Sequence, residues 1–366
     1  MASDSAPVDA TTQLNARRAR RGTTVLAVSA VLALIGAILE IIIGPLDISG
    51  DDMLAVLRGY VGWDGAHEVS AVKVGVIENI RAPRALLAAL VGATLGTAGA
   101  VMQGFFRNPL ADPGLIGVSS GGALAAVAVI VLGGTVMQSV LIGFGSFALP
   151  IVAFMGSLAT VALIYQLSII DRRVIVATML LAGVAANALA FSGIGYLTFL
   201  ADDTQLRDLT FWTLGSLGGA IWERVLPAGA LMVVALVGLL SLTRPMNALL
   251  LGEADASNLG VNVEGVKRRA AFFTALGVGS ATAVCGVVNF VGLVIPHLVR
   301  LMTGPDHKFV LPGSAVLGAA LVLFSDLITR VSVAPAELPL GVVTAAIGAP
   351  FFFWLLVRDK RRGELG

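Results

Sequence analysis

Residues Thr243–Arg269 read T-R-P-M-N-A-L-L-L-G-E-A-D-A-S-N-L-G-V-N-V-E-G-V-K-R-R and form a polar loop between two long apolar tracts. Arg244 stands at one border of the loop, and three consecutive cations, Lys267–Arg269, stand at the other. Basic residues beside apolar spans are typical of cytoplasmic loops. Gly252 and Gly260 bracket a polar stretch that predicts a short helix between two helix breakers. The loop is too short for a domain, so we expect it to contact a partner at the membrane surface.

The composition places this loop in a polytopic membrane protein. Of 366 residues, 57% are hydrophobic and 13% are charged, which is about half the roughly 25% charge of a soluble domain. The net charge of +1 and the spread of cations over several loops argue against nucleic acid as a partner. The single cysteine, Cys285, lies in an apolar run, so neither a disulfide framework nor a cysteine metal site is predicted.

Apolar tracts predict ten membrane-spanning helices, since each crossing needs about 20 residues. The tract 270–301 is too long for one crossing, and we divide it near residues 286–292. There N-F-V-G-L-V-I-P, Asn289–Pro296, predicts a bend followed by a short helix that starts at half depth. The other predicted spans are residues 24–43, 84–104, 115–132, 144–167, 174–200, 225–242, 310–329 and 340–357.

The second span carries small residues on one face. Ala88, Gly92, Gly96, Ala100 and Gly104 recur at every fourth position, which permits close backbone contact with neighbouring helices in a membrane. We therefore expect this helix to be surrounded by others.

Charge predicts the orientation of the spans. The basic clusters fall on one side of the membrane and the acidic loops on the other, so the positive-inside rule places both termini in the cytoplasm. Two termini on one side require an even number of crossings. The predicted organisation is a cytoplasmic tail (1–22), one ten-helix transmembrane domain (23–358) with a cytoplasmic coupling loop (244–269), and a second cytoplasmic tail (359–366).

Motifs for chemistry are absent from the sequence. It contains no G-x-x-x-x-G-K-[ST], H-E-x-x-H or G-x-S-x-G, so no nucleotide cradle, zinc protease or hydrolase site is predicted. His67, His297 and His307 are spread over separate segments, which does not match the spacing of a zinc site. The chain is not expected to be an enzyme or to hold a metal.

Charged residues within the spans are few, which bears on the energy source. Glu40 and Asp326 both lie near span ends; we expect Glu40 to reach the interface and Asp326 to pair with Arg330, four residues on. An ion-coupled transporter usually places carboxylates deep in its spans. A stand-alone ion-coupled transporter is therefore the alternative, and we expect the energy to come from a soluble ATPase acting on the loop.

Three cations stand at the predicted outer surface. Arg81 and Arg84 precede the second span, and Arg330 ends the ninth. They could contact lipid phosphates or bind carboxylates of an extracytoplasmic protein.

Four long motifs, in order, resemble those of the FecCD-type permeases, the membrane subunits of importers for vitamin B12, ferric siderophores and haem. The resemblance covers about residues 24–358. The motifs are G-A-V-M-Q-G-F-F-R-N-P-L-A-D-P-G-L-I-G-V-S-S-G at Gly99–Gly121, T-R-P-M-N with L-G-E-A-x-A-x-x-L-G after it, G-L-V-I-P-H-L-V-R at Gly292–Arg300, and E-L-P-L-G-V-V-T-A-A-I-G-A-P-F-F at Glu337–Phe352.

The resemblance implies an all-α integral membrane protein with the ten-helix type II ABC importer permease fold. It implies a homodimer in the bacterial cytoplasmic (inner) membrane, with two ATPase subunits that bind ATP and Mg on the cytoplasmic face and a periplasmic binding protein outside. The chain itself is expected to bind no cofactor.

The resemblance also implies roles for single residues. Arg81, Arg84 and Arg330 match positions expected to pair with glutamates of the binding protein. The residues expected to contact the ATPase and couple it to transport are Gly252, Glu253, Ala254, Ala256, Leu259 and Gly260. The residues expected to line the pathway and its cytoplasmic gate are Val174, Thr178, Leu181 and Asn187.

The substrate is predicted from the segment Ala201–Leu217, which looks most like the haem permeases of the family. Haem is therefore favoured, with a ferric siderophore or cobalamin as alternatives. No residue is identified as an axial haem ligand.

Overall fold

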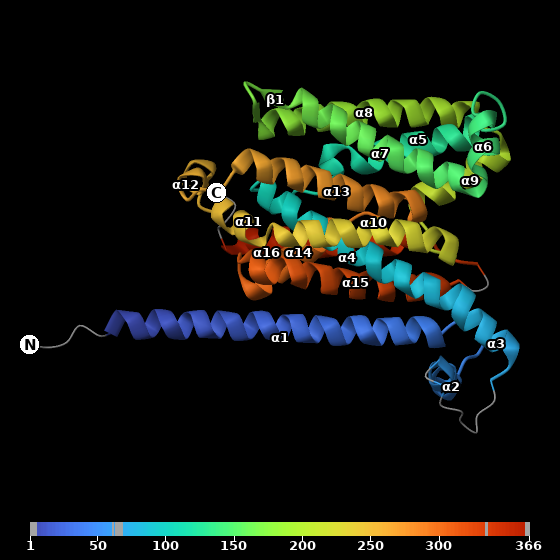
Figure 1. Ribbon diagram of the computed structural model, residues 1–366, viewed down its shortest axis with the longest axis horizontal. Coiled ribbons are helices and arrows are strands. Elements are labelled where there is room, and N and C mark those ends of the chain that lie inside the picture. The colour runs from blue at the N-terminus through green and yellow to red at the C-terminus, as the bar shows by residue number, and fades with distance from the viewer. Residues whose placement is uncertain (1–5, 61, 63–68, 334–335, 363–366) are drawn as a thin grey trace, which may run out of the picture.

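Long helices that run side by side along one axis make up the chain in the computed structural model (Figure 1). The structure describes residues 6–60, 62, 69–333 and 336–362, so 1–5 and 363–366 of the predicted tails and His67 lie outside it. The only strands within these ranges, β1 (Ile169–Ile170) and β2 (Arg173–Val174), form a two-residue hairpin. Helix α1 begins and α16 ends at the end of the bundle that carries α12, which we name the inner end; the opposite end is the outer end.

Six helical segments are long and apolar enough to cross a membrane, by length and composition among the described residues. Three shorter apolar helices are α5 (Val118–Leu132), α14 (Val291–Thr303) and α16 (Leu340–Arg362, apolar to Leu355). With α13 (Val263–Cys285), whose first turns carry the cations of the loop, these elements fit the predicted ten crossings. The six long segments are Arg18–Ile42 in α1 (Ala6–Ile42), Ala71–Phe105 in α3 (Ala71–Val76), a π-helical turn (Ile77–Arg81) and α4 (Ala82–Phe105), Leu141–Leu167 ending in α7 (Ala148–Leu167), α8 (Val176–Leu200), α10 (Trp222–Ser241) and α15 (His307–Val331).

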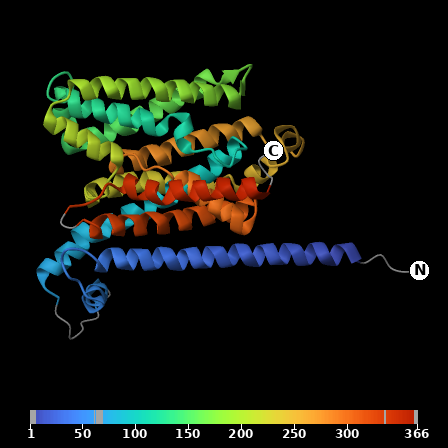
Figure 2. The ribbon, with the colours of Figure 1, turned by 180° about the vertical axis from the view of Figure 1, so that it is seen from behind.

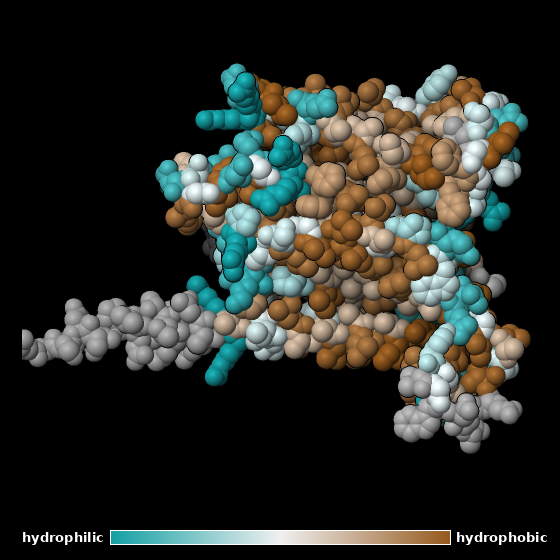
Figure 3. All heavy atoms as spheres, in the orientation of Figure 1, coloured by the Kyte–Doolittle hydropathy of each residue, from teal (hydrophilic) through white to brown (hydrophobic). Residues whose placement is uncertain are grey.

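Apolar side chains form a belt across the middle of the face seen in Figure 3, and hydrophilic side chains gather at the two ends of this face. Short elements lie at these ends. The outer end carries α2 (Gly50–Tyr60), α6 (Gln138–Phe144) and α9 (Asp203–Leu214), and the inner end carries α11 (Thr243–Leu249) and α12 (Glu253–Asn258). Helices α1 and α8 lie on opposite sides of the bundle in both views (Figures 1 and 2).

Two predicted outer loops are partly helical. The helix that contains Pro83 starts at Ala71, because a π-helical turn before the proline adapts the backbone to its ring. Within the predicted loop after α8, Asp202 forms a capping box with Gln205 and starts α9. The helix of the second predicted span, residues 84–104, therefore begins before residue 84, and the predicted outer loop after the fifth span contains a helix.

Helix α4 is the buried centre of the bundle, as its small residues predict. A Cβ atom at Gly92 would lie 2.2 Å from the carbonyl oxygen of Gly318 in α15, and one at Gly99 would lie 1.8 Å from that of Gly292 in α14. Only hydrogen fits at these crossings. The small face thus lets α4 contact two helices at backbone distance.

The predicted bend near residues 286–292 is confirmed. Helix α13 ends at Cys285, and both Gly286 (φ 72°) and Phe290 (φ 68°) have left-handed backbone conformations. Helix α14 follows with 13 residues, about 20 Å in length. Its second residue, Gly292, contacts the middle of α4, so α14 begins at half depth.

Candidate functional site

The inner end presents a short helix on two glycine hinges. Gly252 (φ 126°) precedes α12 and Gly260 (φ 82°) follows it, in conformations that favour glycine. Ala256 is fully buried and anchors α12 to the bundle. The predicted short helix between two breakers is therefore confirmed.

Apolar side chains are exposed around α12. Leu251 is 64% exposed and Leu259 is 65% exposed, although both stand at the hydrophilic end of the molecule. Exposed apolar residues with a polar rim are typical of protein contact sites. Beside them lies a groove of about 640 Å³, lined by Arg173, Glu253, Ala254, Ser257, Asn258, Val261, Asn262, Val263 and Glu264.

A buried ammonium group joins α12 to the start of α8. Lys267 of α13 is 4% exposed, and its Nζ donates to Glu253 Oε2 (2.8 Å) and to the carbonyl oxygen of Val174 (3.0 Å). Glu264 adds a third contact to Nζ at 3.3 Å and accepts the backbone N–H of Val174 at 2.9 Å. Val174 ends β2 and stands two residues before the first residue of α8, Val176, with Ile175 as the N-cap between them. A displacement of Glu253 would therefore act on the short segment that leads into α8.

A cavity of about 480 Å³ lies beside the break between α13 and α14. Irregular backbone at membrane depth is tolerated where it lines a cavity, and such breaks mark transport sites. Its walls come from α5, α8, α9 and the break, and its polar groups are uncharged. The lining residues are Gly114, Ser119, Ser120, Ala123, Asn187, Phe191, Ile194, Thr213, Val287 and Asn289.

The four predicted pathway residues occupy different places. Asn187 lines the cavity and bonds Ser120 and the carbonyl oxygen of Gly114. Leu181 is exposed on α8, Thr178 is half-buried, and Val174 is buried at the inner end beside Lys267. The structure therefore brings Asn187 to the cavity and Val174 to the coupling loop.

At the outer end Arg84 joins three elements. Its Nε and Nη2 atoms donate to Asp326 of α15 (2.7 and 2.9 Å), and Nη1 and Nη2 donate to Glu337, before α16 (2.8 and 2.9 Å). Such paired contacts of one guanidinium with a carboxylate are the strongest protein ion pairs. Asp326 therefore pairs mainly with Arg84, and its contact with Arg330 is longer, at 3.7 Å.

Arg330 and Arg81 bind the end of α1. Arg330 pairs with Glu40 and donates to the Glu40 and Ile43 carbonyl oxygens, while Arg81 donates to those of Ile41 and Ile42. Cations at a helix C-terminus satisfy its free carbonyls. Glu40 is completely buried, so the expectation that it reaches the interface was wrong.

The exposure expected of the three arginines was also wrong, because each is less than a tenth exposed. A buried cation in a membrane protein needs a partner, and the chain supplies carboxylates and carbonyls internally. Docking of another protein through Arg81, Arg84 or Arg330 stays a prediction, and it would require an exchange of these internal partners.

Two important residues, Lys267 and Glu337, received no role from sequence reasoning. Lys267 was grouped with Arg268 and Arg269 as loop charge, although Glu264 stands three residues before it, at helical contact spacing. Glu337 opens the fourth motif and stands just before α16 begins at Leu340. Nothing local indicated their partners. Among the described residues no cluster of three His, Cys, Asp or Glu side chains could hold a metal ion.

Known proteins match this chain in sequence and in fold. The model of the FecCD transport family matches residues 31–358. The hemin transport system permease protein HmuU of Yersinia pestis is 45% identical over 294 residues, which is 78% of this chain and 84% of that protein. The cobalamin import system permease protein BtuC of Halobacterium salinarum is 40% identical over 296 residues, 81% and 76% of the two chains. An inward-facing metal-chelate type ABC transporter superposes with a TM-score of 0.78 at 30% identity, covering 92% and 99%.

Proposed function

The chain belongs to the FecCD transport family, and from this premise we propose that it passes haem from a periplasmic binding protein to the cytoplasm. It is the multi-pass permease component of an ABC importer for haem, vitamin B12 or a siderophore, and ATP hydrolysis belongs to a separate subunit. In the proposed assembly, two copies of the chain form the pathway. Two ATPase subunits dock at the inner end, which faces the cytoplasm with both termini.

The observation that carries the proposed ATPase contact is the exposure of Leu251 and Leu259 beside α12. Apolar side chains at a hydrophilic end are costly in water, and a partner that covers them removes this cost. The hinge glycines let α12 protrude, while Ala256 keeps it attached to the bundle.

The direct test replaces Leu259 by glutamate. We expect this variant to keep its fold and to bind the ATPase at least about ten-fold more weakly, as for loss of an interface anchor. Binding is measured by co-purification and titration. The control is Leu57→Glu, the same change at an exposed position of α2, at the outer end. Equal ATPase binding by both variants would remove the assignment.

Glu253 is less suited to this test than its position in α12 suggests. Its carboxylate pairs with the buried Lys267, so Glu253→Arg would bring two cations together and disturb the fold as well as the contact. Failure of that variant would therefore not separate docking from folding.

Alternating access follows from the link between α12 and α8 as part of the proposal. ATP binding on the partner subunits would move α12, and Lys267 would pass the movement to Val174 and thus to α8. Helix α8 carries Asn187, which lines the cavity. The coupling loop and the pathway would thus respond together.

Haem as substrate rests on two observations. The relative at 45% identity is a hemin permease, and the cavity is lined by serine, threonine and asparagine with apolar groups, without charge. Such walls hold a large planar ligand weakly, so the binding protein would supply affinity. A ferric siderophore or cobalamin is the alternative cargo, which the cobalamin relative supports.

The cargo is tested with the complete complex in proteoliposomes. We expect haem uptake that depends on ATP and on the cognate binding protein, and no uptake of cobalamin or ferric siderophore under the same conditions. Uptake of cobalamin or a siderophore in place of haem would reject the haem assignment and keep the importer class.

The competing class is a stand-alone ion-coupled transporter. Glu40 and Asp326, the carboxylates within the predicted spans, are paired with arginines at the outer end and do not line the cavity, which argues against a proton path through them. Reconstitution of the chain alone under a proton gradient decides between the classes. We expect no uptake, and uptake without any ATPase would reject the proposal.

A further inference from the structure

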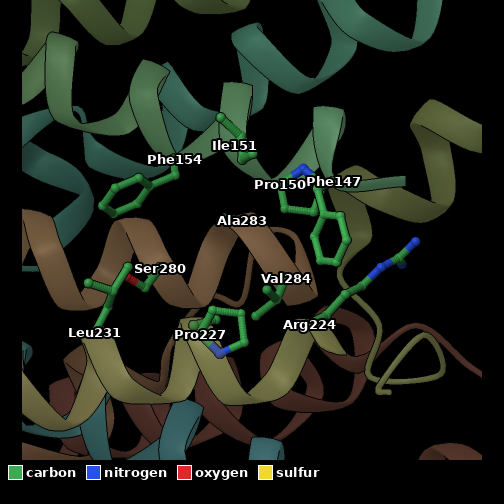
Figure 4. A pocket seen from close by; sticks show the side chains of 11 residues that line it. Phe147, Pro150, Ile151, Phe154, Arg224, Pro227, Leu231, Ser280, Ala283 and Val284 are labelled. Atoms are coloured by element: carbon green, nitrogen blue, oxygen red, sulfur yellow. The ribbon is translucent and has the colours of Figure 1, made fainter. Parts of the chain in front are cut away.

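Two cavities outside the sites above adjoin at the outer half of the bundle. The first is an apolar groove of about 200 Å³ between α7, α10 and α13. In Figure 4, Phe154 and Leu231 lie at one end of the groove and Arg224 lies at the other. Its lining is Phe147, Pro150, Ile151, Phe154, Arg224, Pro227, Ala228, Leu231, Ser280, Ala283 and Val284.

The second cavity is larger, at about 370 Å³, and more polar. It shares Pro150, Arg224, Ala283 and Val284 with the apolar groove. The residues that line it include Asp208, Trp212, Ser146 and Ser216. An apolar chamber and a polar chamber therefore meet at one cation.

Arg224 is poorly satisfied by the chain itself. Its Nη2 donates to the carbonyl oxygen of Ser146 at 3.4 Å, and its Nε is buried without a hydrogen-bond partner. Among the described residues, no carboxylate forms an ion pair with it within 4.0 Å. In Figure 4 its guanidinium points away from the groove. A buried guanidinium nitrogen without an acceptor is costly, so an external anion is expected.

The position of the groove points to lipid. The helices that form it carry exposed apolar side chains, among them Ile151 of α7 and Leu226 and Val234 of α10, as on a face covered by acyl chains. Arg224 stands in the first turn of α10, and this helix begins at the outer end of the bundle (Figure 1). Arginine and tryptophan at this depth typically meet lipid headgroups.

We propose that the groove binds one phospholipid of the outer leaflet. An acyl chain lies in the apolar groove, and the phosphate accepts hydrogen bonds from Arg224 at the junction with the polar chamber. Along the site, an apolar wall is followed by a cation and then by a polar wall. This order matches the acyl chain and the phosphate of a phospholipid. The proposal is independent of the cargo of the importer.

The test is native mass spectrometry of the full-length permease purified with bacterial phospholipid. We expect one retained phospholipid per protomer, and Arg224→Gln should lower the lipid-bound fraction at least about ten-fold through loss of a charge-assisted hydrogen bond. Leu231→Trp fills the groove from its partly exposed rim and should lower the lipid-bound fraction as well. Arg207→Gln, an exposed arginine of α9, is the control and should retain lipid.

Three outcomes would overturn the assignment. Retention of lipid by both Arg224→Gln and Leu231→Trp places the lipid elsewhere. Loss of lipid only in Leu231→Trp would mean that an apolar molecule fills the groove and that no phosphate contacts Arg224. A photoactivatable phospholipid can also be cross-linked to the wild-type permease. If it labels other helices and leaves α10 and α13 unlabelled, the groove is rejected as the binding site without the use of any variant.

Discussion

At the residue scale, the buried charges of the outer end form one network of arginines and carboxylates. Arg84 holds Asp326 and Glu337, and Arg330 holds Glu40. The network ties α1, α4 and α15 to the segment before α16. Arginine suits this role because its planar fork can bind two carboxylates at once. These charges stabilise the fold mainly because removal of one leaves another buried without a partner.

Loss of Arg84 should therefore destabilise the permease. We expect Arg84→Gln to lower the free energy of unfolding by about 3–5 kcal/mol, because the buried Asp326 loses its two close hydrogen bonds to a cation and keeps only the longer contact with Arg330 at 3.7 Å. The measurement is thermal unfolding in detergent, with Arg207→Gln as an exposed control. The double variant Arg84→Met/Asp326→Leu removes both charges and should recover most of the loss. An unchanged unfolding temperature in Arg84→Gln would contradict the account.

Glu337 predicts a dependence of stability on pH. Hydrogen bonds from Arg84 hold the pKa of this loop carboxyl below its ordinary value, so the folded state favours the ionised form. The contribution of the Glu337 carboxylate to the free energy of unfolding is complete above the ordinary glutamate pKa of about 4.3. It is lost as the pH falls through the lowered pKa of the folded state. The stability difference between wild type and Glu337→Gln should therefore shrink on acidification below pH ~4.3. If the stability difference between the two proteins stays constant as the pH falls below ~4.3, Glu337 does not stabilise the fold through its ionised form.

At the scale of elements, the contact between α4 and its neighbours depends on missing side chains. Backbone groups of α14 and α15 occupy the volume that a methyl group at Gly99 or Gly92 would need. Close backbone contact of this kind replaces hydrophobic driving force between helices in a membrane. The half-depth start of α14 depends on it, because Gly292 meets Gly99 there.

Gly99→Ala should separate these helices. We expect overpacking to lower the free energy of unfolding by about 1–3 kcal/mol or more, since the new Cβ atom would lie 1.8 Å from a carbonyl oxygen. The matched control is Gly75→Ala in α3, where no atom lies within 4 Å of the added carbon and helix propensity favours alanine. Yields of monodisperse protein and unfolding temperatures provide the measurement. Equal behaviour of the two variants would refute the packing argument.

The link from α12 to α8 also belongs to this scale. Lys267→Met should keep ATPase binding and hydrolysis but lower transport by about ten-fold, within the range of measured coupling energies. The reason is that Glu253 and Val174 no longer share the ammonium group. Transport and ATP hydrolysis are measured together in proteoliposomes, with the exposed Arg268→Met as control. A parallel fall of both activities would indicate a folding defect and not uncoupling.

At the scale of the whole molecule, the single chain leaves α8 uncovered. Leu181, Leu189 and Phe199 are more than two-thirds exposed on this helix, which also carries Asn187 of the cavity. A cavity at the side of one chain becomes a closed pathway only if a second surface completes it. A two-fold dimer that places α8 of both copies at the axis would do so, since such interfaces pair the same surface of each copy.

Leu189→Cys should therefore cross-link two copies. Leu189 is 73% exposed, and the native Cys285 is buried, so background reaction should be low. We expect a disulfide-linked dimer on mild oxidation in membranes. Val237→Cys, an exposed position on α10, is the control and should stay monomeric. Cross-linking through α10 in preference to α8 would place the dimer axis elsewhere.

The sequence by itself determined the apolar crossings, the break between α13 and α14, the buried face of α4 and the short helix between Gly252 and Gly260. These are local properties: an apolar run of sufficient length, small residues at every fourth position, or glycines at the ends of a polar segment act within a few turns of the chain. Four family motifs then placed these parts in one architecture.

Only the tertiary structure decided which charge meets which partner. Arg84 and Asp326, Arg330 and Glu40, and Lys267 and Val174 are far apart along the chain, and a local pattern suggested the weaker contact of Asp326 with Arg330. Burial in a membrane requires every charge to find a counterpart, but it does not specify one. The choice follows from the packing of helices around α4, which brings these side chains within hydrogen-bonding distance.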